Sequence, residues 1–127
     1  MALAHDLGGL LAARRLRLPL TIVLQDNEGG GIFDFLPVAG TRPREHYEVH
    51  VATPTGLDPA HVAQLFGLAY RPAVDVDGFR AALDAGLAHP GVTLIHAHTD
   101  RAHNVRLHRE VWDEVGRGLA GISRSPG

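Results

Sequence analysis

Residues 18–37 read LPLTIVLQDNEGGGIFDFLP, an apolar run that ends in a polar, glycine-rich turn. The run contains Leu20, Ile22, Val23 and Leu24 and is bounded by Pro19 and by the turn. Such a short continuous apolar segment is typical of a strand that is buried on both faces of a parallel sheet. We therefore expect this strand to lie inside the sheet and not at its edge.

The turn follows the carboxyl end of this strand, where ligands bind in open α/β sheets. A hard divalent cation such as Mg²⁺ prefers oxygen ligands, and Asn27 offers an amide oxygen while a following glycine can direct a backbone carbonyl to the same point. Three successive glycines also allow a diphosphate to approach closely. A tight strand-to-helix turn without any ligand explains the glycines equally well.

The rest of the chain alternates between helical and extended patterns. This alternation predicts right-handed βαβ crossovers and an α/β fold, a three-layer domain with a mostly parallel sheet. The expected domain covers residues 1–122, with a tail at 123–127. Four helices are predicted: from Asp6 to about residue 15, from Asp58 to Gly67, from Asp75 to about residue 89, and over Thr99–Gly121. The second should bury Val62, Leu65 and Phe66, and the third should turn Phe79, Ala82, Leu83 and Leu87 inward. Strands are predicted at 68–72 and 92–98.

One segment carries a less regular signal than the rest of the chain. Residues 38–54 contain Gly40, Pro43 and Pro54 and predict an irregular excursion with a short extended piece at 46–51. The last helix carries Val111, Trp112, Val115 and Leu119 at helical spacing, and we expect it to close the domain.

Composition excludes several classes of protein. The chain has 127 residues, a net charge of −2 and no cysteine, so it has neither a disulfide framework nor a thiolate site. It shows no basic footprint for nucleic acid, since Arg14, Arg15 and Arg17 form only a short run that solvation explains. It contains no apolar run of membrane-spanning length and no basic signal segment, so we expect a cytoplasmic protein without a membrane partner.

The histidines and carboxylates offer alternative sites that the sequence disfavours. His46 and His50 are four residues apart, but no helical pattern surrounds them, and His96, His98, His103 and His108 lack a cysteine partner. A sheet end that faces a polar helix start explains the last four. Asp26, Glu28 and Asp34 could form an acid–base pair, although solvated carboxylates near a turn are as common. Neither a Gly-x-Ser-x-Gly elbow nor a Walker A sequence is present.

The sequence Asp-Asn-Glu-Gly-Gly-Gly-Ile-Phe at 26–33, followed by Asp-Phe-Leu-Pro, resembles the second half of a known cofactor motif. It is the thiamine diphosphate motif as found in the 2-succinyl-5-enolpyruvyl-6-hydroxy-3-cyclohexene-1-carboxylate synthases of menaquinone biosynthesis. Thr99, Asp100 and Arg101, with the helix that carries His108 and Trp112, are similar to the C-terminal segment of that family. The resemblance therefore spans nearly the whole chain.

The resemblance implies a thiamine diphosphate-binding, diphosphate-domain fold and two ligands, thiamine diphosphate and Mg²⁺. The complete enzyme of that family decarboxylates 2-oxoglutarate and adds the succinic semialdehyde carbanion to isochorismate, and it acts as a homodimer or homotetramer. No catalytic residue is implied for this chain, because the activating glutamate belongs to an N-terminal domain of the partner subunit. The implied positions are Asn27 and Gly29 for the metal; Ala2, Gly29, Gly30 and Ile32 for the cofactor; and Ile32, Phe33 and Leu36 for the substrate.

Two departures from the family pattern shape the expectation. Asp26 replaces the first Asn of the usual pair, and the metal-binding Asp of the Gly-Asp half is expected immediately before Met1. We therefore expect an N-terminally truncated portion of the enzyme that is inactive alone. The alternatives are a non-catalytic assembly module with the same fold, or another thiamine diphosphate-dependent decarboxylase or carboligase, which the run Ile-Phe-Asp-Phe-Leu-Pro at 32–37 disfavours.

Overall fold

The computed structural model describes residues 2–122 and contains one parallel sheet of three strands. The strand order is β1 (Leu20–Asp26), β3 (Val92–His98), β2 (Ala69–Ala73), with β3 in the centre. Leu20 of β1 pairs with Val92 and Asp26 pairs with His98, so β1 and β3 run side by side along their whole length. The predicted strand 92–98 is confirmed, and the one predicted at 68–72 lies one residue later.

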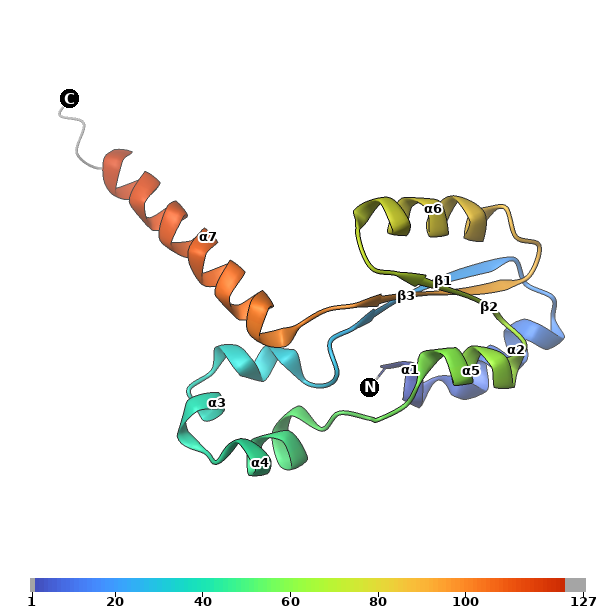
Figure 1. Cartoon of the computed structure of the whole chain (residues 1–127), viewed down its shortest axis with the longest axis horizontal. Helices are drawn as coiled ribbons and strands as arrows, with labels where there is room; N and C mark the ends of the chain where they lie inside the picture. The colour runs from blue at the N-terminus through green and yellow to red at the C-terminus, as the bar shows by residue number, and fades with distance from the viewer. Residues whose placement is uncertain (1, 123–127) are drawn as a thin grey trace.

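Helices cover both faces of the sheet, which confirms the three-layer architecture. Helix α6 (Val76–Leu87) covers one face, and α2 (Leu7–Arg15) and α5 (Pro59–Phe66) lie on the other (Figure 1). Two of the predicted helix starts carry their N-cap here, since Asp75 accepts a hydrogen bond from the Gly78 amide at 2.7 Å and Asp58 accepts one from the Ala60 amide at 2.8 Å. Gly67 ends α5 in the left-handed conformation, with φ 66°.

The core lies between β3 and α6. Leu94, Ile95 and Thr93 are fully buried in the central strand. On the α6 side Ile95 packs with Ala73 and Ala82, and Phe79 and Leu83 close the cluster. Leu65 and Leu87, predicted to face inward, are instead 73% and 70% exposed, because a helical stripe only becomes buried where another element covers it.

Strand β1 is an edge strand of this sheet, which corrects the expectation that it lies inside. It pairs with β3 on one side, and no strand within residues 2–122 pairs with its other side. Leu20 and Val23 are accordingly 40% and 48% exposed. The apolar run shows that these side chains favour burial, but it does not show which element covers them.

Residues 31–52 are helical, so the prediction of an irregular segment with an extended piece at 46–51 is wrong. The chain forms η1 (Gly31–Phe35, a 3₁₀ helix), α3 (Val38–Thr41), α4 (Arg44–Tyr47) and η2 (Glu48–Ala52, a π-helix). Tyr47 and Ala52 are 4% and 0% exposed. An extended segment would need a strand partner, whereas the helical turns satisfy their own backbone and bury these two residues.

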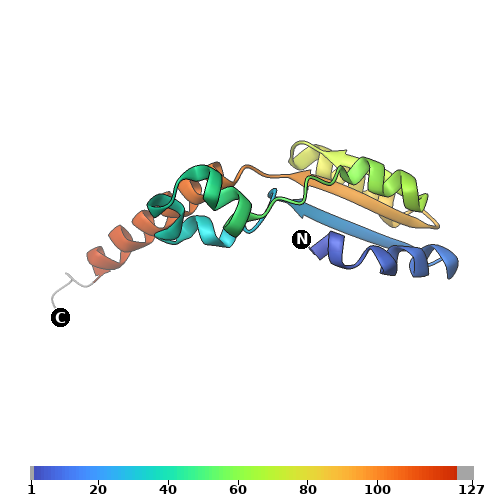
Figure 2. The ribbon, with the colours of Figure 1, turned by 90° about the horizontal axis from the view of Figure 1, so that it is seen from below.

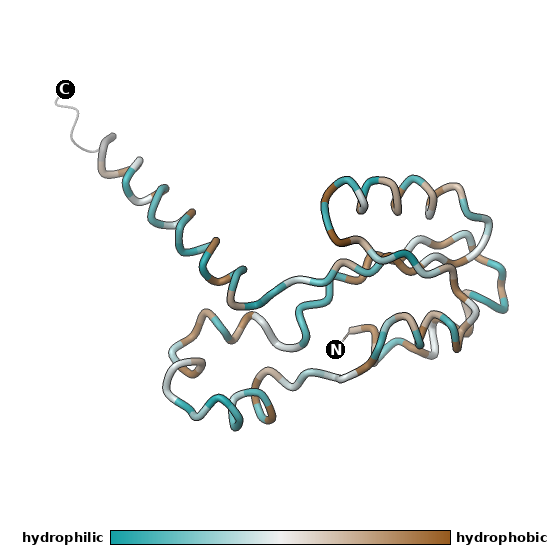
Figure 3. The backbone as a smooth tube through the Cα atoms, viewed as in Figure 1, coloured by the Kyte–Doolittle hydropathy of each residue, from teal (hydrophilic) through white to brown (hydrophobic). Residues whose placement is uncertain are grey.

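The last helix, α7 (Arg101–Ile122), is present as predicted but does not close over the sheet. Figures 1 and 2 show it projecting away from the α/β body, and Figure 3 shows apolar segments along it. Its predicted apolar positions are more than half exposed: Val111, Trp112, Val115 and Leu119. The predicted tail 123–127 lies outside the described residues, and within these no helix combines the length and the hydropathy that a membrane crossing needs.

A short helix that the sequence did not predict, α1 (Ala2–His5), precedes α2. Asp6 stands between the two helices, at the predicted cap position, but its side chain makes no capping hydrogen bond. Helix α1 begins on the side of the molecule where β1 ends (Figures 1 and 2).

Candidate cofactor-binding site

The turn after β1 is held by hydrogen bonds from its own side chains. The Glu28 amide donates to Asp26 Oδ1 at 3.0 Å, and the Gly29 amide donates to Asn27 Oδ1 at 3.3 Å. Glu28 adopts the left-handed conformation with φ 54°, and Gly29 follows with φ 136°. Such backbone angles are costly for most residues, so the turn is fixed by its surroundings.

Close contacts with the η2 backbone and with Asn27 explain two of the glycines, Gly29 and Gly31. A Cβ atom on Gly29 would collide with the carbonyl oxygen of Ala52, and the amide of Gly30 donates to that same oxygen at 2.7 Å. A Cβ atom on Gly31 would lie 2.6 Å from Asn27 Nδ2, so Gly31 leaves room for the amide side chain. The glycines thus serve the packing of the turn and keep Asn27 in place.

The donor set of the turn suits a hard cation only in part. Asn27 Oδ1 accepts a single long hydrogen bond and keeps a lone pair, and oxygen is the ligand that Mg²⁺ prefers. Within residues 2–122, however, no three His, Cys, Asp or Glu side chains converge on one point. Of the oxygen ligands that Mg²⁺ prefers, the turn therefore offers the Asn27 amide oxygen and backbone carbonyls.

The residues predicted to contact the thiazolium ring or the substrate follow the turn: Ile32 and Phe33 lie on η1, and Leu36 directly follows it. Ile32, Phe33 and Leu36 are 73%, 41% and 51% exposed, so they do not form an enclosed pocket within the described part of the chain. The Phe33 ring lies over Gly30, with Cδ2 3.0 Å from a Cβ built there. Ala2 is exposed in α1.

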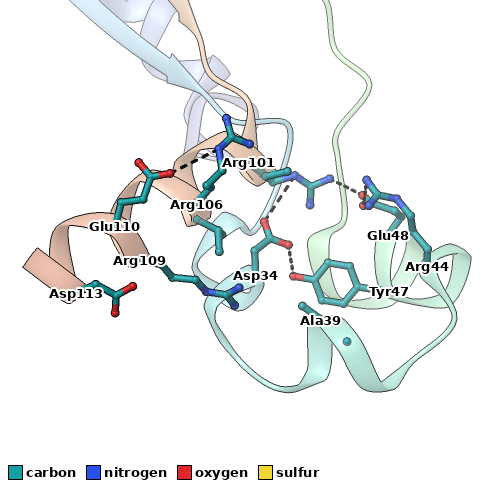
Figure 4. Close-up of a pocket in the computed structure, with 13 residues that line it drawn as sticks. Asp34, Ala39, Arg44, Tyr47, Glu48, Arg101, Arg106, Arg109, Glu110 and Asp113 are labelled. Atoms are coloured by element: carbon teal, nitrogen blue, oxygen red, sulfur yellow. Dashed lines mark hydrogen bonds and ion pairs between the residues drawn. The ribbon is translucent and has the colours of Figure 1, made fainter.

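A cluster that the sequence did not reveal joins η1, α4, η2 and α7 (Figure 4). The Arg101 guanidinium donates to Glu48 Oε2 at 2.6 Å, and its Nε lies 3.9 Å from Asp34 Oδ2. The Tyr47 hydroxyl donates to Asp34 Oδ1 at 2.6 Å. The four residues come from three separate segments of the chain, so no local pattern could have predicted their contact.

Burial governs the protonation of this cluster. Burial, with the hydrogen bond to Asp34 and its charge, raises the pKa of Tyr47 to about 12. Burial alone would lower the pKa of Arg101, but the hydrogen bond to Glu48 and the charges of Glu48 and Asp34 outweigh it and raise that pKa. Arg101 Nη1 and Asp34 Oδ2 are buried without a hydrogen-bond partner. Beside the cluster lies an open hollow of about 560 Å³, into which Arg44, Arg109 and Asp113 also face.

A second set of polar contacts links all three strands. Tyr70 Oη and His96 Nδ1 are 2.8 Å apart, and His96 Nε2 lies 3.1 Å from Asp26 Oδ2. His98, on the same face, contacts Glu28 Oε1 at 3.1 Å, and its ring centroid is 6.4 Å from that of His96. The pattern of alternate residues predicted that His96 and His98 share a face, but it could not predict their carboxylate partners.

The other histidine pair lies on a helix, contrary to the expectation from sequence. His46 belongs to α4 and His50 to η2, and their rings meet edge to face with centroids 6.1 Å apart.

Comparison with known proteins places the turn and the sheet in one family. Residues 2–97 match the model of the thiamine pyrophosphate enzyme C-terminal TPP-binding domain. The chain belongs to the thiamine pyrophosphate enzyme family. The matched range includes the turn at 26–31, β1, β2, α6 and β3 as far as Ala97, and it ends before α7.

Similar proteins carry one name, 2-succinyl-5-enolpyruvyl-6-hydroxy-3-cyclohexene-1-carboxylate synthase. The one from Bacillus velezensis is 44% identical over 107 residues, which is 84% of this chain and 18% of the relative. The one from Geobacillus kaustophilus is 43% identical over 116 residues, 91% of this chain and 20% of the relative. The one from Myxococcus xanthus is 41% identical over 120 residues, 94% of this chain and 20% of the relative. The chain thus spans about a fifth of the length of these relatives of the thiamine pyrophosphate enzyme family.

Proposed function

We propose that this chain holds the diphosphate end of thiamine diphosphate through a magnesium ion, as the C-terminal portion of a 2-succinyl-5-enolpyruvyl-6-hydroxy-3-cyclohexene-1-carboxylate synthase in the cytoplasm. The observation that carries the proposal is the turn at 26–31, within the range matched by the TPP-binding domain. In it Asn27 keeps a free lone pair beside a glycine of unusual backbone conformation.

Each residue of the turn has a distinct part in the proposal. Asn27 ligates Mg²⁺ through its amide oxygen, and Gly29 does so through its carbonyl. The main chain at Gly30 and Ala2 lies against the diphosphate, and Ile32 contacts the cofactor ring. Once bound, thiamine diphosphate supplies the electron sink for decarboxylation and carboligation, while the protein supplies position.

The substrates follow from the relatives and the exposed side chains of η1. We assign 2-oxoglutarate and isochorismate as substrates of the whole protein. Ile32, Phe33 and Leu36 form one wall of the substrate pocket, and their exposure in this chain leaves them available to a second surface. That surface belongs to another domain or to a second subunit of a homodimer or homotetramer, which also supplies the glutamate that activates the cofactor.

The proposal is tested by following the amide signals of the turn by NMR while thiamine diphosphate is added with Mg²⁺ or with EDTA. We expect weak, magnesium-dependent shifts at Gly29, Gly30 and Gly31, because the described residues, 2–122, offer the metal no cluster of acidic ligands. Asn27→Ala should abolish these shifts, since no nearby neutral group replaces the amide oxygen.

His61→Ala is the matched control, because His61 is exposed on α5 and, within the described residues, forms an ion pair with Asp58 and not with the turn. It should leave the titration unchanged. Equal shifts in wild type and Asn27→Ala would refute the assignment of the metal ligand. A dissociation constant in the micromolar range or tighter would refute the expectation of weak binding.

A further inference from the structure

His96, on the central strand, contacts a residue of each neighbouring strand, near the end of the sheet where the turn at 26–31 begins. Tyr70 comes from β2, His96 from β3 and Asp26 from β1. Contacts of 2.8 Å and 3.1 Å join them in series, and the His96 side chain is only 15% exposed. A mostly buried histidine with a partner at each ring nitrogen has one fixed ring orientation.

The direction of these hydrogen bonds follows from the partners. A carboxylate has no hydrogen to donate, so Nε2 of His96 donates to Asp26 Oδ2. In the neutral imidazole Nδ1 then accepts, and the Tyr70 hydroxyl donates to it. The partners therefore select the tautomer that is protonated at Nε2.

Asp26 links the fixed ring of His96 to the turn. Its second carboxylate oxygen, Oδ1, accepts the amide of Glu28, the residue in the left-handed conformation. Its backbone carbonyl is held separately by the Thr99 amide at 2.7 Å, so the end of β1 stays in place without the side-chain contact. The carboxylate thus has one acceptor oxygen for the sheet and one for the turn.

We propose that His96 is a positioning residue for the turn that presents Asn27 and Gly29, acting through the Asp26 carboxylate. This inference rests on the proposed function for its consequence in cofactor binding. It also accounts for an aspartate at position 26: the Glu28 amide and His96 Nε2 each donate to a different carboxylate oxygen, and asparagine would place an NH₂ donor at one of these two positions.

The first experiment needs no cofactor. The rate of hydrogen exchange at the Glu28 amide is measured by NMR in the whole chain. His96→Ala should speed it roughly 3- to 10-fold, as expected for the loss of one ordinary hydrogen bond. His96→Gln, which keeps both a donor and an acceptor, should restore the rate.

His98→Ala is the control variant, since His98 lies on the same face but contacts the carboxylate of Glu28 and not Asp26. It should leave the exchange rate within about twofold of wild type.

The second measurement is the tautomer of His96, read from its ring nitrogen shifts. Wild type should be protonated at Nε2. In the Asp26→Asn variant, either the His96 ring proton should move to Nδ1 or hydrogen exchange at the Glu28 amide should become faster. A wild-type ring protonated at Nδ1, an Asp26→Asn variant that changes neither observable, or a His96→Ala variant with wild-type exchange at Glu28 would overturn the proposal.

The third measurement separates this inference from the proposed function. If thiamine diphosphate with Mg²⁺ shifts the turn in wild type, His96→Ala should weaken that binding by a factor similar to its effect on Glu28 exchange, and His96→Gln should restore it. If exchange and tautomer behave as expected but wild type shows no shifts with the cofactor, the positioning role of His96 stands and the cofactor assignment fails.

Discussion

Gly29 shows how a single residue serves both the packing of the turn and the candidate site. Its backbone has φ 136°, and its missing side chain lets the Ala52 carbonyl lie against the Cα atom. The same conformation directs the Gly29 carbonyl, which we assign to the metal. The structural demand and the proposed functional one therefore fall on the same position, and the sequence could not distinguish them.

Gly29→Val should consequently destabilise the chain by at least about 2 kcal/mol and abolish the cofactor-induced shifts, since a β-branched side chain fits neither the backbone angle nor the space. Chemical denaturation followed by circular dichroism measures the free energy of unfolding. Gly40→Ala is the control, because a Cβ atom at Gly40 meets no atom within 4 Å. A Gly29→Val variant as stable as Gly40→Ala would show that the turn can rearrange at little cost.

Asp26 and Asn27 could be placed from sequence at the end of a strand, because a short apolar run bounded by proline and glycine is a strong strand signal. Their partners could not be placed. His96 is 70 residues from Asp26 along the chain, and only the register of β1 against β3 brings the two together. Local periodicity does not contain that information.

At the scale of elements, Arg101 holds η1, η2 and the start of α7 together. Arg101→Ala should lower the free energy of unfolding by about 2–3 kcal/mol, because it removes the buried cation from two largely buried carboxylates, Asp34 and Glu48, and leaves Glu48 with only the exposed Arg44. Arg44→Ala is a matched control on the same acceptor: its ion pair with Glu48 spans 3.6 Å and its side chain is 87% exposed. It should change the stability by less than about 0.5 kcal/mol. Equal effects of the two substitutions would contradict a structural role for Arg101.

The helices of the second half were predictable where their caps are local, as at Asp58, Asp75 and Asp100. Asp100 accepts the amide of His103 at 2.5 Å. Residues 38–54 were not predictable, because proline and glycine suggested breaks while the helical turns depend on tertiary contacts of Tyr47 and Arg101. The prediction that β1 lies inside the sheet failed for a related reason. An apolar composition indicates that side chains favour burial, but it does not indicate which element covers them.

At the scale of the whole molecule, the chain exposes more surface than its mass requires. Its accessible area is 9159 Å² for 13.6 kDa, roughly 40% more than a compact monomer of that size. The unpaired side of β1 and the apolar residues of α7 account for part of this excess. Exposed apolar surface of this kind is typical of an interface.

We therefore expect the chain to associate at micromolar concentrations, and sedimentation velocity measures this directly. Val111→Glu together with Val115→Glu on α7 should weaken association, whereas Glu110→Gln, on the same helix but outside the apolar stripe, should not. A stable monomer that binds no hydrophobic dye would contradict the expectation.

The alkaline limit of stability should be set by tyrosine. All 12 basic side chains are arginines and no cysteine is present, so the two tyrosines are the side chains that titrate between about pH 9 and 12. Tyr47 has its folded pKa raised from 10.0 to about 12, so its contribution is complete below pH 10 and is lost as the pH rises toward 12. Stability should fall by about 2–3 kcal/mol over this range.

Denaturation curves at several alkaline pH values test this expectation, and Tyr47→Phe should remove most of the pH dependence. Tyr70→Phe should remove less of it, since Tyr70, although its pKa is also raised, has no carboxylate bound to its hydroxyl. An unchanged slope in Tyr47→Phe would assign the alkaline loss to other groups.

The contact between η1 and α7 carries its own optical reporter. The single tryptophan, Trp112, lies with its ring centroid 5.7 Å from that of Phe35 and 6.1 Å from that of His108. With excitation that selects tryptophan over tyrosine, its emission therefore senses whether α7 rests on the segment that follows the turn at 26–31, since the sheet contains no tryptophan. Unlabelled protein can thus be followed by fluorescence as ligand is added, and lifetime or quenching measurements would register a rearrangement at η1 separately from unfolding of the α/β body.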